Sequence, residues 1–224
     1  MARSLTVSVT GHRLNQLPEA QRPRIAQEIS RVLGAIEDAG RSSHGLDVRL
    51  TLCSAIAEGA DRYAADAALD RGWRLITPLP FAIDRYEKDF GDTASVDAFQ
   101  RYLKLSDKVW SMGDVDVAAA GSGGAAPYAA VGIALVEQAD VLIAVWNGQA
   151  PAGPGGTAEV GARMIEGGGP VIWIHTLEPL AGRLILPRPL PRGSSLARKL
   201  INALGERFDQ VERPGELRMA HAGA

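Results

Sequence analysis

Three short segments combine glycines with charged or hydroxyl side chains at positions typical of ligand-binding turns. They read "TGHR" at Thr10–Arg13, "SAIAEGAD" at Ser54–Asp61 and "GPGGTAEV" at Gly153–Val160. Each follows an apolar run with many β-branched residues, and the last two lead into Ala-rich stretches of helical composition. This pattern predicts three turns that carry the chain from a strand towards a helix.

The third segment has the composition of a phosphate-binding turn. Gly155 and Gly156 stand immediately before Thr157, the expected first residue of a helix. Backbone N–H groups at the start of a helix are unpaired and carry a partial positive charge, and glycine lets an anion come close to them. Thr157 could add a hydroxyl donor. The same residues would also form a plain tight turn in which Thr157 caps the helix.

Acidic residues stand in or just before the first turns of two expected helices. Glu159 could hydrogen-bond the hydroxyls of a ribose or orient a water molecule, and Glu58 and Asp61 could act in the same way beside Ser54 and Gly59. Carboxylates at the start of a helix also complement its dipole without binding any ligand. Both interpretations stay open for the three acids.

The ends of the first and fifth expected strands add further candidates. Arg13 follows Gly11, and its guanidinium could bind a phosphate or a carboxylate, or form an ordinary surface ion pair. His12 is expected to make a single backbone hydrogen bond. Asn147 is a candidate ligand contact at the end of the fifth strand. The ring of Trp146 could stack on a base, although a core position is favoured.

Short β-rich runs alternate with amphipathic helical stretches, which is typical of βαβ units around a parallel sheet. We expect an α/β fold with a single doubly wound, mostly parallel Rossmann-like sheet of about six strands and helices on both faces. The strands are expected at Leu5–Thr10, Val48–Ser54, Trp73–Pro78, Lys108–Ser111, Val141–Trp146 and Pro170–His175. The helices are expected at Glu19–Ala39, Ala60–Arg71, Ile83–Phe90, Ala94–Leu105, Tyr128–Gln138, Thr157–Glu166 and Ser195–Phe208.

In such a sheet every strand-to-helix turn lies at the carboxyl edge of the strands, where these folds bind ligands. The three glycine segments should therefore meet at one edge. The Gly-, Ser- and Ala-rich stretch from Asp114 to Pro127 belongs to the same edge. Its composition predicts a flexible loop, which would be either a lid over a ligand or a connection without function.

Composition is that of an ordinary globular protein. Of the 224 residues 46% are hydrophobic and 22% are charged, and the formal net charge is -2. We expect one nucleotide-binding domain over residues 1–210 and a flexible tail over residues 211–224. A near-neutral charge gives no general attraction to nucleic acid. The single cysteine, Cys53, is expected in the core, and the four histidines lack metal-ligand spacing, so no metal or other cofactor is predicted.

The chain shows no membrane or export signal in its sequence. No apolar run approaches the ~18 residues that a membrane-spanning helix needs, and the chain starts with a strand pattern instead of a signal peptide. We therefore expect a soluble, cytoplasmic protein.

In their order and spacing these segments resemble the SLOG superfamily of Rossmann-like proteins. The superfamily includes lysine-decarboxylase-like phosphoribohydrolases, the DNA-processing protein A family and nucleotide-sensing domains. The matching segments span about Leu5 to His175 and are "TGHR", "SAIAEGAD", "PLPF", "SDKV" and "ADVLIAVWNG" followed by "GPGGTAEV". The resemblance implies a pocket for a nucleotide or nucleotide-derived ligand, with the Gly-Gly-Thr turn on phosphate. It also makes a homodimer one expected assembly.

The chain departs from the phosphoribohydrolase motif at one point. Those enzymes carry Pro-Gly-Gly-x-Gly-Thr-x-x-Glu and need the glutamate to cleave the N-glycosidic bond, whereas this chain has Pro-Gly-Gly-Thr-Ala-Glu from Pro154 to Glu159. A displacement of one residue turns a helical side chain by about 100° and moves it about 1.5 Å along the axis. Such a change would move the carboxylate away from the carbon at which the N-glycosidic bond is cleaved.

The sequence is therefore compatible with three functions. The first is a sensor or carrier that binds a nucleotide-type small molecule at the carboxyl edge. The alternative is an N-ribohydrolase that releases the base from nucleoside 5′-monophosphates, with Glu159 either assisting departure of the base or activating water and with Arg101 or Arg13 as its arginine. Binding of single-stranded DNA is the third, and an aromatic content of 5% argues against a nucleic-acid partner.

Overall fold

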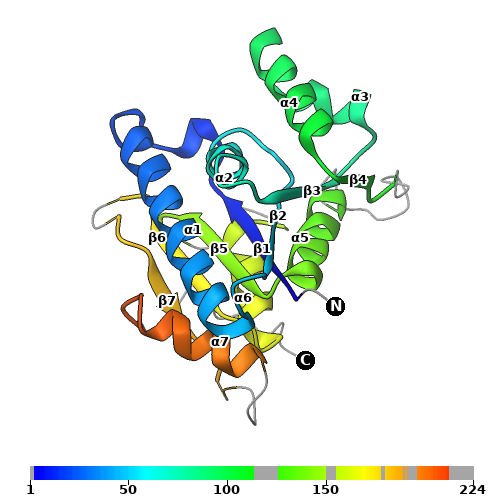
Figure 1. Ribbon diagram of the computed structural model, residues 1–224. Helices are drawn as coiled ribbons and strands as arrows, with labels where there is room; N and C mark the ends of the chain where they lie inside the picture. Colours follow the sequence, from blue (N-terminus) through cyan, green and yellow to red (C-terminus); the bar gives the residue numbers. More distant parts are fainter. Residues whose placement is uncertain are drawn as a thin grey trace, which may run out of the picture.

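A computed structural model describes residues 3–113, 126–149, 155–177, 180–188, 190 and 196–211. Seven strands of this part form one sheet in the order β4-β3-β2-β1-β5-β6-β7 (Figure 1). The strands are β1 (Ser4–Gly11), β2 (Arg49–Cys53), β3 (Arg74–Leu79), β4 (Lys108–Ser111), β5 (Val141–Trp146), β6 (Val171–His175) and β7 (Arg183–Ile185). The first six are parallel, so the α/β, mostly parallel sheet is confirmed with one strand more than expected.

Helices connect the parallel strands. They are α1 (Arg22–His44), α2 (Ala60–Leu69), α3 (Ile83–Tyr86), α4 (Thr93–Leu105), α5 (Ala126–Gln138), α6 (Thr157–Glu166) and α7 (Leu196–Gly205). Short 3-10 helices stand at η1 (Leu14–Gln16), η2 (Glu19–Gln21) and η3 (Glu87–Asp89). The first long helix begins at Arg22 instead of Glu19, with Pro23 in its first turn, where a missing N–H costs no helical hydrogen bond.

The strand order reverses direction at β1. Strands β2, β3 and β4 follow β1 on one side, and the chain then returns to place β5 on the other side of β1. In open α/β sheets the ligand crevice lies at such a switch point, outside the carboxyl ends of the two strands. The topology therefore predicts a ligand site at the carboxyl ends of β1 and β5.

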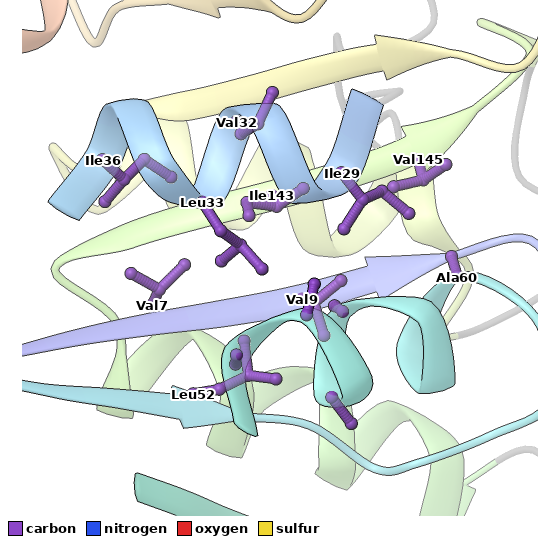
Figure 2. Close-up of a cluster of buried hydrophobic side chains, with 14 of the residues drawn as sticks. Val7, Val9, Ile29, Val32, Leu33, Ile36, Leu52, Ala60, Ile143 and Val145 are labelled. Carbon is purple, nitrogen blue, oxygen red and sulfur yellow. The ribbon is translucent and has the colours of Figure 1, made fainter. Parts of the chain in front are cut away.

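Strand β5 is buried on both faces. Val141, Ile143 and Val145 belong to the cluster beneath α1 and α2, whereas Leu142, Ala144 and Trp146 belong to the cluster beneath α6. Figure 2 shows the apolar stripe of α1 lying over the central strands, with its side chains directed at the sheet. Burial on both faces explains why the β5 sequence is a continuous apolar run without alternation.

The last strand and helix were only partly foreseen. Strand β7 pairs antiparallel with β6 at the edge of the sheet, in a stretch expected to be a Pro-rich connection.

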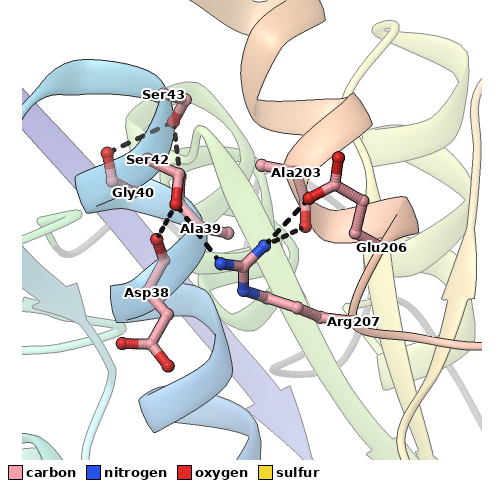
Figure 3. Close-up of polar contacts among 8 residues, drawn as sticks. All are labelled: Asp38, Ala39, Gly40, Ser42, Ser43, Ala203, Glu206 and Arg207. Atoms are coloured by element: carbon pink, nitrogen blue, oxygen red, sulfur yellow. Dashed lines mark hydrogen bonds and ion pairs between the residues drawn. The ribbon is translucent and has the colours of Figure 1, made fainter.

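Helix α7 packs on α1. Arg207 links the two helices: its Nη1 donates to the carbonyl of Ala203 in α7 (2.8 Å), and its Nη2 donates to Oγ of Ser42 in α1 (3.3 Å), as Figure 3 shows. The Val211 N–H donates to the carbonyl of Leu184. The expected tail therefore begins against β7, and its residues 212–224 lie outside the described residues.

The core positions expected for Trp146 and Cys53 are confirmed by their burial. Trp73 and Trp146 are buried, whereas Trp110 and Trp173 are half-buried. A stacking role for the Trp146 ring is not supported, since the residue is only 2% exposed. Burial raises the pKa of the Cys53 thiol to about 12, which keeps it protonated and unreactive at neutral pH.

Two kinds of feature are absent from the part of the chain just defined. None of its helices combines the length and the apolar character needed to cross a bilayer. None of its His, Cys, Asp and Glu side chains form a group of three or more arranged to hold a metal ion. The expected lid, residues 114–125 of the Gly-rich stretch, falls outside the described residues.

Candidate functional site

A cleft of about 370 Å³ lies at the carboxyl edge between β1 and β5, at the switch point of the sheet. Its walls are the end of β1, the end of β5 and the first turn of α6. Six residues singled out from the sequence line this cleft: Gly11, Arg13, Asn147, Gly155, Gly156 and Thr157. The first and third glycine segments therefore meet, as the strand-end argument predicts.

A smaller recess of about 100 Å³ adjoins the cleft. The two hollows share Thr10, Gly11, Arg13 and Gly155 as lining residues. Three further polar side chains line the recess, and each comes from a different helix: Asp61 of α2, Tyr86 of α3 and Tyr128 of α5. The cleft thus continues towards the second glycine segment.

Gly11 and Gly59 bring the first two segments into backbone contact. A Cβ atom on Gly11 would lie 2.5 Å from Cβ of Ala60, and one on Gly59 would lie 2.6 Å from the carbonyl oxygen of His12. Gly59 also has a φ of +96°, a conformation that side chains rarely adopt. These glycines are required by close packing between the end of β1 and the start of α2, whether or not a ligand binds.

The glycine at position 155 is also required by its backbone conformation and by a neighbouring main chain. Its φ is +78°, and a Cβ atom there would lie 2.7 Å from the backbone nitrogen of Ala129 in α5. Gly156 is different, because its φ of -67° and ψ of 156° are accessible to any residue at a helix N-cap. Close packing therefore explains Gly155, while nothing in the backbone conformation requires a glycine at position 156.

The start of α6 opens into the cleft. No side chain of the described residues caps this helix, and Gly156, Thr157 and Ala158 all line the cleft. The N–H groups of Thr157 and Ala158 are too close to the helix start to have helical acceptors. Among the described residues these amides have no hydrogen-bond acceptor, and the cleft also contains the positive end of a helix dipole. Gly153 and Pro154, the first residues of the segment, lie outside the described residues.

Glu159 does not line the cleft. Its Oε2 accepts a hydrogen bond from the Gly155 N–H at 2.8 Å, and its Oε1 lies 3.6 Å from Nη2 of Arg163. A glutamate three residues into a helix commonly reaches back to an amide of the preceding turn in this way. One amide of the expected phosphate seat is therefore occupied by the protein itself, and the remaining seat is Gly156, Thr157 and Ala158.

We expect Glu159→Ala to lower the free energy of unfolding by about 1 kcal/mol, because it removes the acceptor for the Gly155 amide. Glu159→Gln keeps an acceptor oxygen and should lose less than half as much. Urea unfolding of the three proteins measures the difference. An alanine variant as stable as wild type would show that the hydrogen bond contributes nothing.

Asp61 is a buried carboxyl at the wall of the recess. The residue is 5% exposed, and its Oδ2 accepts a hydrogen bond from the Ala57 N–H at 3.3 Å. Burial raises the pKa of Asp61 to about 7, although the Ala57 amide, the Ser54 hydroxyl and the cations Arg13 and Arg62 act in the opposite direction. Near neutral pH the recess therefore contains a carboxyl group that is only partly ionised.

Arg13 stands where the cleft meets the recess. Its Nη2 lies 3.4 Å from Oδ2 of Asp89, and its guanidinium lies 5.8 Å from the ring centre of Tyr128. The Tyr128 hydroxyl donates a hydrogen bond to Asp89. Because the side chains of Arg13 and Asp89 are 33% and 28% exposed, this ion pair is solvated, and an anion in the cleft could compete for the guanidinium.

The structure places four other candidates away from the two hollows. Ser54 is fully buried and its Oγ accepts from the Ile56 N–H, while Gly59 packs against the backbone of the first segment. Glu58 accepts a hydrogen bond from the Ser95 hydroxyl of α4. Arg101, one of the two arginines considered for catalysis, pairs with Asp66 at 3.2 Å between exposed parts of α4 and α2. With Glu159, these groups support the loops and do not line the site.

Tyr86, Tyr128 and Asp89 were not foreseen. All three follow β3 or β4, whose carboxyl ends lie at the same edge as the glycine segments. The strand-end argument could have found them if it had been extended to the helices after "PLPF" and after the Gly-rich stretch. No glycine turn precedes Tyr86 and Asp89, and Tyr128 follows the Gly-rich stretch as the first residue of an expected helix, so no motif marked these three side chains.

A larger hollow of about 500 Å³ lies at the opposite, amino edge of the sheet. Two of its charged side chains already have protein partners. Arg3 donates from Nη1 to the carbonyl of His44 at 3.1 Å, and Oδ2 of Asp140 accepts from the Thr6 N–H at 2.8 Å. Parallel α/β sheets bind ligands at the carboxyl edge, so the smaller cleft is the candidate site.

Comparison with known proteins adds evidence on the fold. No protein-family model and no curated protein matches the chain. DNA processing protein A from Streptococcus pneumoniae is 17% identical with a TM-score of 0.51, over 95% of this chain and 59% of that protein. The molybdenum cofactor carrier protein from Chlamydomonas reinhardtii is 19% identical with a TM-score of 0.43, over 96% and 94%. DNA processing protein A from Helicobacter pylori, described with a single-stranded DNA binding mode, is 14% identical with a TM-score of 0.42, over 93% and 74%.

The likeness to the pneumococcal protein shows a shared fold. The chain spans 59% of the length of that protein. Its parallel sheet with the switch point at β1 is the Rossmann-like arrangement that the SLOG resemblance implies. The chain therefore shares the Rossmann-like fold of the pneumococcal protein.

Proposed function

We propose that this protein binds a nucleotide or nucleotide-derived phosphorylated small molecule in the cleft between β1 and β5, as a sensor or carrier. The observation that carries the proposal is the start of α6, which no side chain of the described residues caps and which opens into a cleft at the switch point of the sheet. Free amides at a helix N-terminus are suited to a phosphate group. Arg13 at the rim supplies a guanidinium that can pair with the same anion.

The cleft supports binding more than turnover. The carboxylate of Glu159, which the ribohydrolase alternative needs at the reacting carbon, faces the Gly155 amide and Arg163. No other observation on the described residues favours that alternative. The names of the two DNA processing proteins raise DNA binding as a further candidate function. An oligodeoxythymidine is therefore included among the probes below.

The proposal is tested by placing a negative charge in the seat. Gly156 has N-cap dihedral angles, and aspartate is a good N-cap residue, so Gly156→Asp should fold at least as stably as wild type while its carboxylate repels phosphate. Thermal unfolding is followed with inorganic pyrophosphate, the four nucleoside 5′-monophosphates, ADP-ribose, NAD and oligodeoxythymidine. Wild type should be stabilised by about 2.7 kcal/mol when a bound probe is present at a hundred times its dissociation constant. The variant should show no shift with that probe.

Gly156→Asn is the matched control, because asparagine caps the helix without a charge. We expect it to retain part of the ligand-induced shift. Absence of any shift in wild type at millimolar concentrations of every probe would contradict the proposal. Equal shifts in wild type and Gly156→Asp would contradict the assignment of the phosphate to α6.

A further inference from the structure

The recess beside the cleft has features that phosphate binding does not use. It is bounded by Asp61 of α2, Tyr86 of α3 and Tyr128 of α5, and it shares only the end of β1, Arg13 and Gly155 with the cleft. Asp61 is an acceptor when ionised, and its position at the wall of the recess would repel a phosphate group. The recess is therefore built for another part of the ligand.

The buried carboxyl has spare hydrogen-bonding capacity. An ionised carboxylate can accept about four hydrogen bonds, whereas Asp61 receives those of the Ala57 amide and the Ser54 hydroxyl. A buried charge with unused acceptor positions is costly unless a donor reaches it. A ligand that brings hydroxyl donors would remove this cost.

We propose that the recess takes the ribose of the ligand, with Asp61 accepting hydrogen bonds from its hydroxyls, so that the protein selects ribonucleotides over 2′-deoxyribonucleotides. This inference rests on the proposed binding of a nucleotide-type ligand in the cleft. It adds the identity of the sugar, which the phosphate seat alone leaves open.

Three observations favour the sugar over the base as the occupant. The ribose is bonded directly to the 5′-phosphate, and the recess directly adjoins the seat through Gly11 and Gly155. The recess measures about 100 Å³ against about 370 Å³ for the cleft, so the larger base fits the outer space. A carboxylate selects for donors, and vicinal hydroxyls provide two of them side by side.

The inference is tested by titration calorimetry at pH 8, where Asp61 is ionised. The probes are the four nucleoside 5′-monophosphates, their 2′-deoxy counterparts, inorganic pyrophosphate and oligodeoxythymidine. Asp61→Asn removes the charge and keeps an acceptor for the Ala57 amide, so the loop should stay in place. Asp66→Asn is the matched control on the same helix, because Asp66 contacts Arg101 and Tyr102 of α4 and lies outside both hollows.

We expect wild type and Asp66→Asn to bind the preferred ribonucleotide about tenfold more tightly than its 2′-deoxy counterpart, the factor expected for hydrogen bonds to a charged group. Asp61→Asn should bind both at the weaker affinity and should bind pyrophosphate as wild type does. Circular dichroism and thermal unfolding confirm that each variant is folded.

Each other outcome has a distinct meaning. If neither pyrophosphate nor any nucleotide binds to wild type, the proposed function fails, and the inference fails with it. Equal affinity of wild type for ribo- and deoxyribonucleotides overturns the inference and leaves the proposed function standing. Loss of pyrophosphate binding in Asp61→Asn, or preferential binding of oligodeoxythymidine by wild type, also overturns the inference.

Discussion

Asp61→Asn is expected to raise the free energy of unfolding at pH 8 by up to roughly 4 kcal/mol. Burial raises the pKa of Asp61 from 3.8 to about 7 in the folded protein, and a pKa difference of that size corresponds to roughly 4 kcal/mol. The asparagine avoids the cost of ionising a buried group and can still accept from the Ala57 amide. A gain in stability from replacing a buried polar group of a candidate site is a common trade-off between stability and function.

The sign of the pH dependence follows from proton binding. Between pH 3.8 and about 7 the folded state holds the Asp61 proton while the unfolded state has released it. The stability contributed by this group is therefore full below pH 4 and falls as the pH rises to 7. Urea unfolding of both proteins between pH 4 and pH 8.5 should show stability curves that converge at the acid end, diverge as the pH rises to about 7 and keep a constant difference above that pH.

Asp66→Asn is again the matched control, because its side chain is 52% exposed. It should change stability by less than 1 kcal/mol, as expected for an exposed ion pair. A stability difference between wild type and Asp61→Asn that does not vary with pH would show that Asp61 does not titrate in this range.

Gly59→Ala should cost about 3 kcal/mol or more, since two unfavourable effects add. The residue has a φ of +96°, and its Cβ atom would lie 2.6 Å from the carbonyl oxygen of His12 and 2.8 Å from the nitrogen of Leu14. Backbone atoms cannot move aside as the end of a flexible side chain can. We expect the variant to have a much lower midpoint of thermal unfolding and to lose the shape of the recess.

Gly72→Ala separates the two effects. Gly72 has a φ of +72°, but a Cβ atom there would meet no atom within 4 Å. Only the conformational cost remains, about 1 kcal/mol. Thermal unfolding by circular dichroism compares the two variants with wild type. Equal destabilisation of both would show that backbone contact at Gly59 contributes nothing.

The sequence was sufficient to predict which residues line the candidate cleft between β1 and β5, because its signals are local. Apolar periodicity defines the strands, and the strand-end rule then brings Gly11, Arg13, Gly155 and Thr157 to one edge. Strand β7 was missed because three residues are too few to show alternation, and its pairing depends on β6. Propensity does not reveal an edge strand formed through its neighbour.

Side-chain direction was the part that the sequence could not give. Glu58 and Asp61 stand in the same segment, yet one contacts Ser95 of α4 and the other lines the recess. Glu159 has the composition of a ligand contact and instead closes the turn before its own helix. These outcomes depend on which neighbour offers a hydrogen bond in three dimensions, and that information lies in distant segments.

Backbone contacts at Gly59 and Gly155 also bear on the thermodynamics of recognition. Gly59 packs against the main chain of residues 12–14, and Gly155 packs against the main chain of α5. These contacts hold the turns at Gly59 and Gly155 against neighbouring main chain in the absence of a ligand. The entropy lost on association would fall mainly on the ligand and on a few side chains such as Arg13, so a preorganised cleft of this kind can reach useful affinity with few contacts.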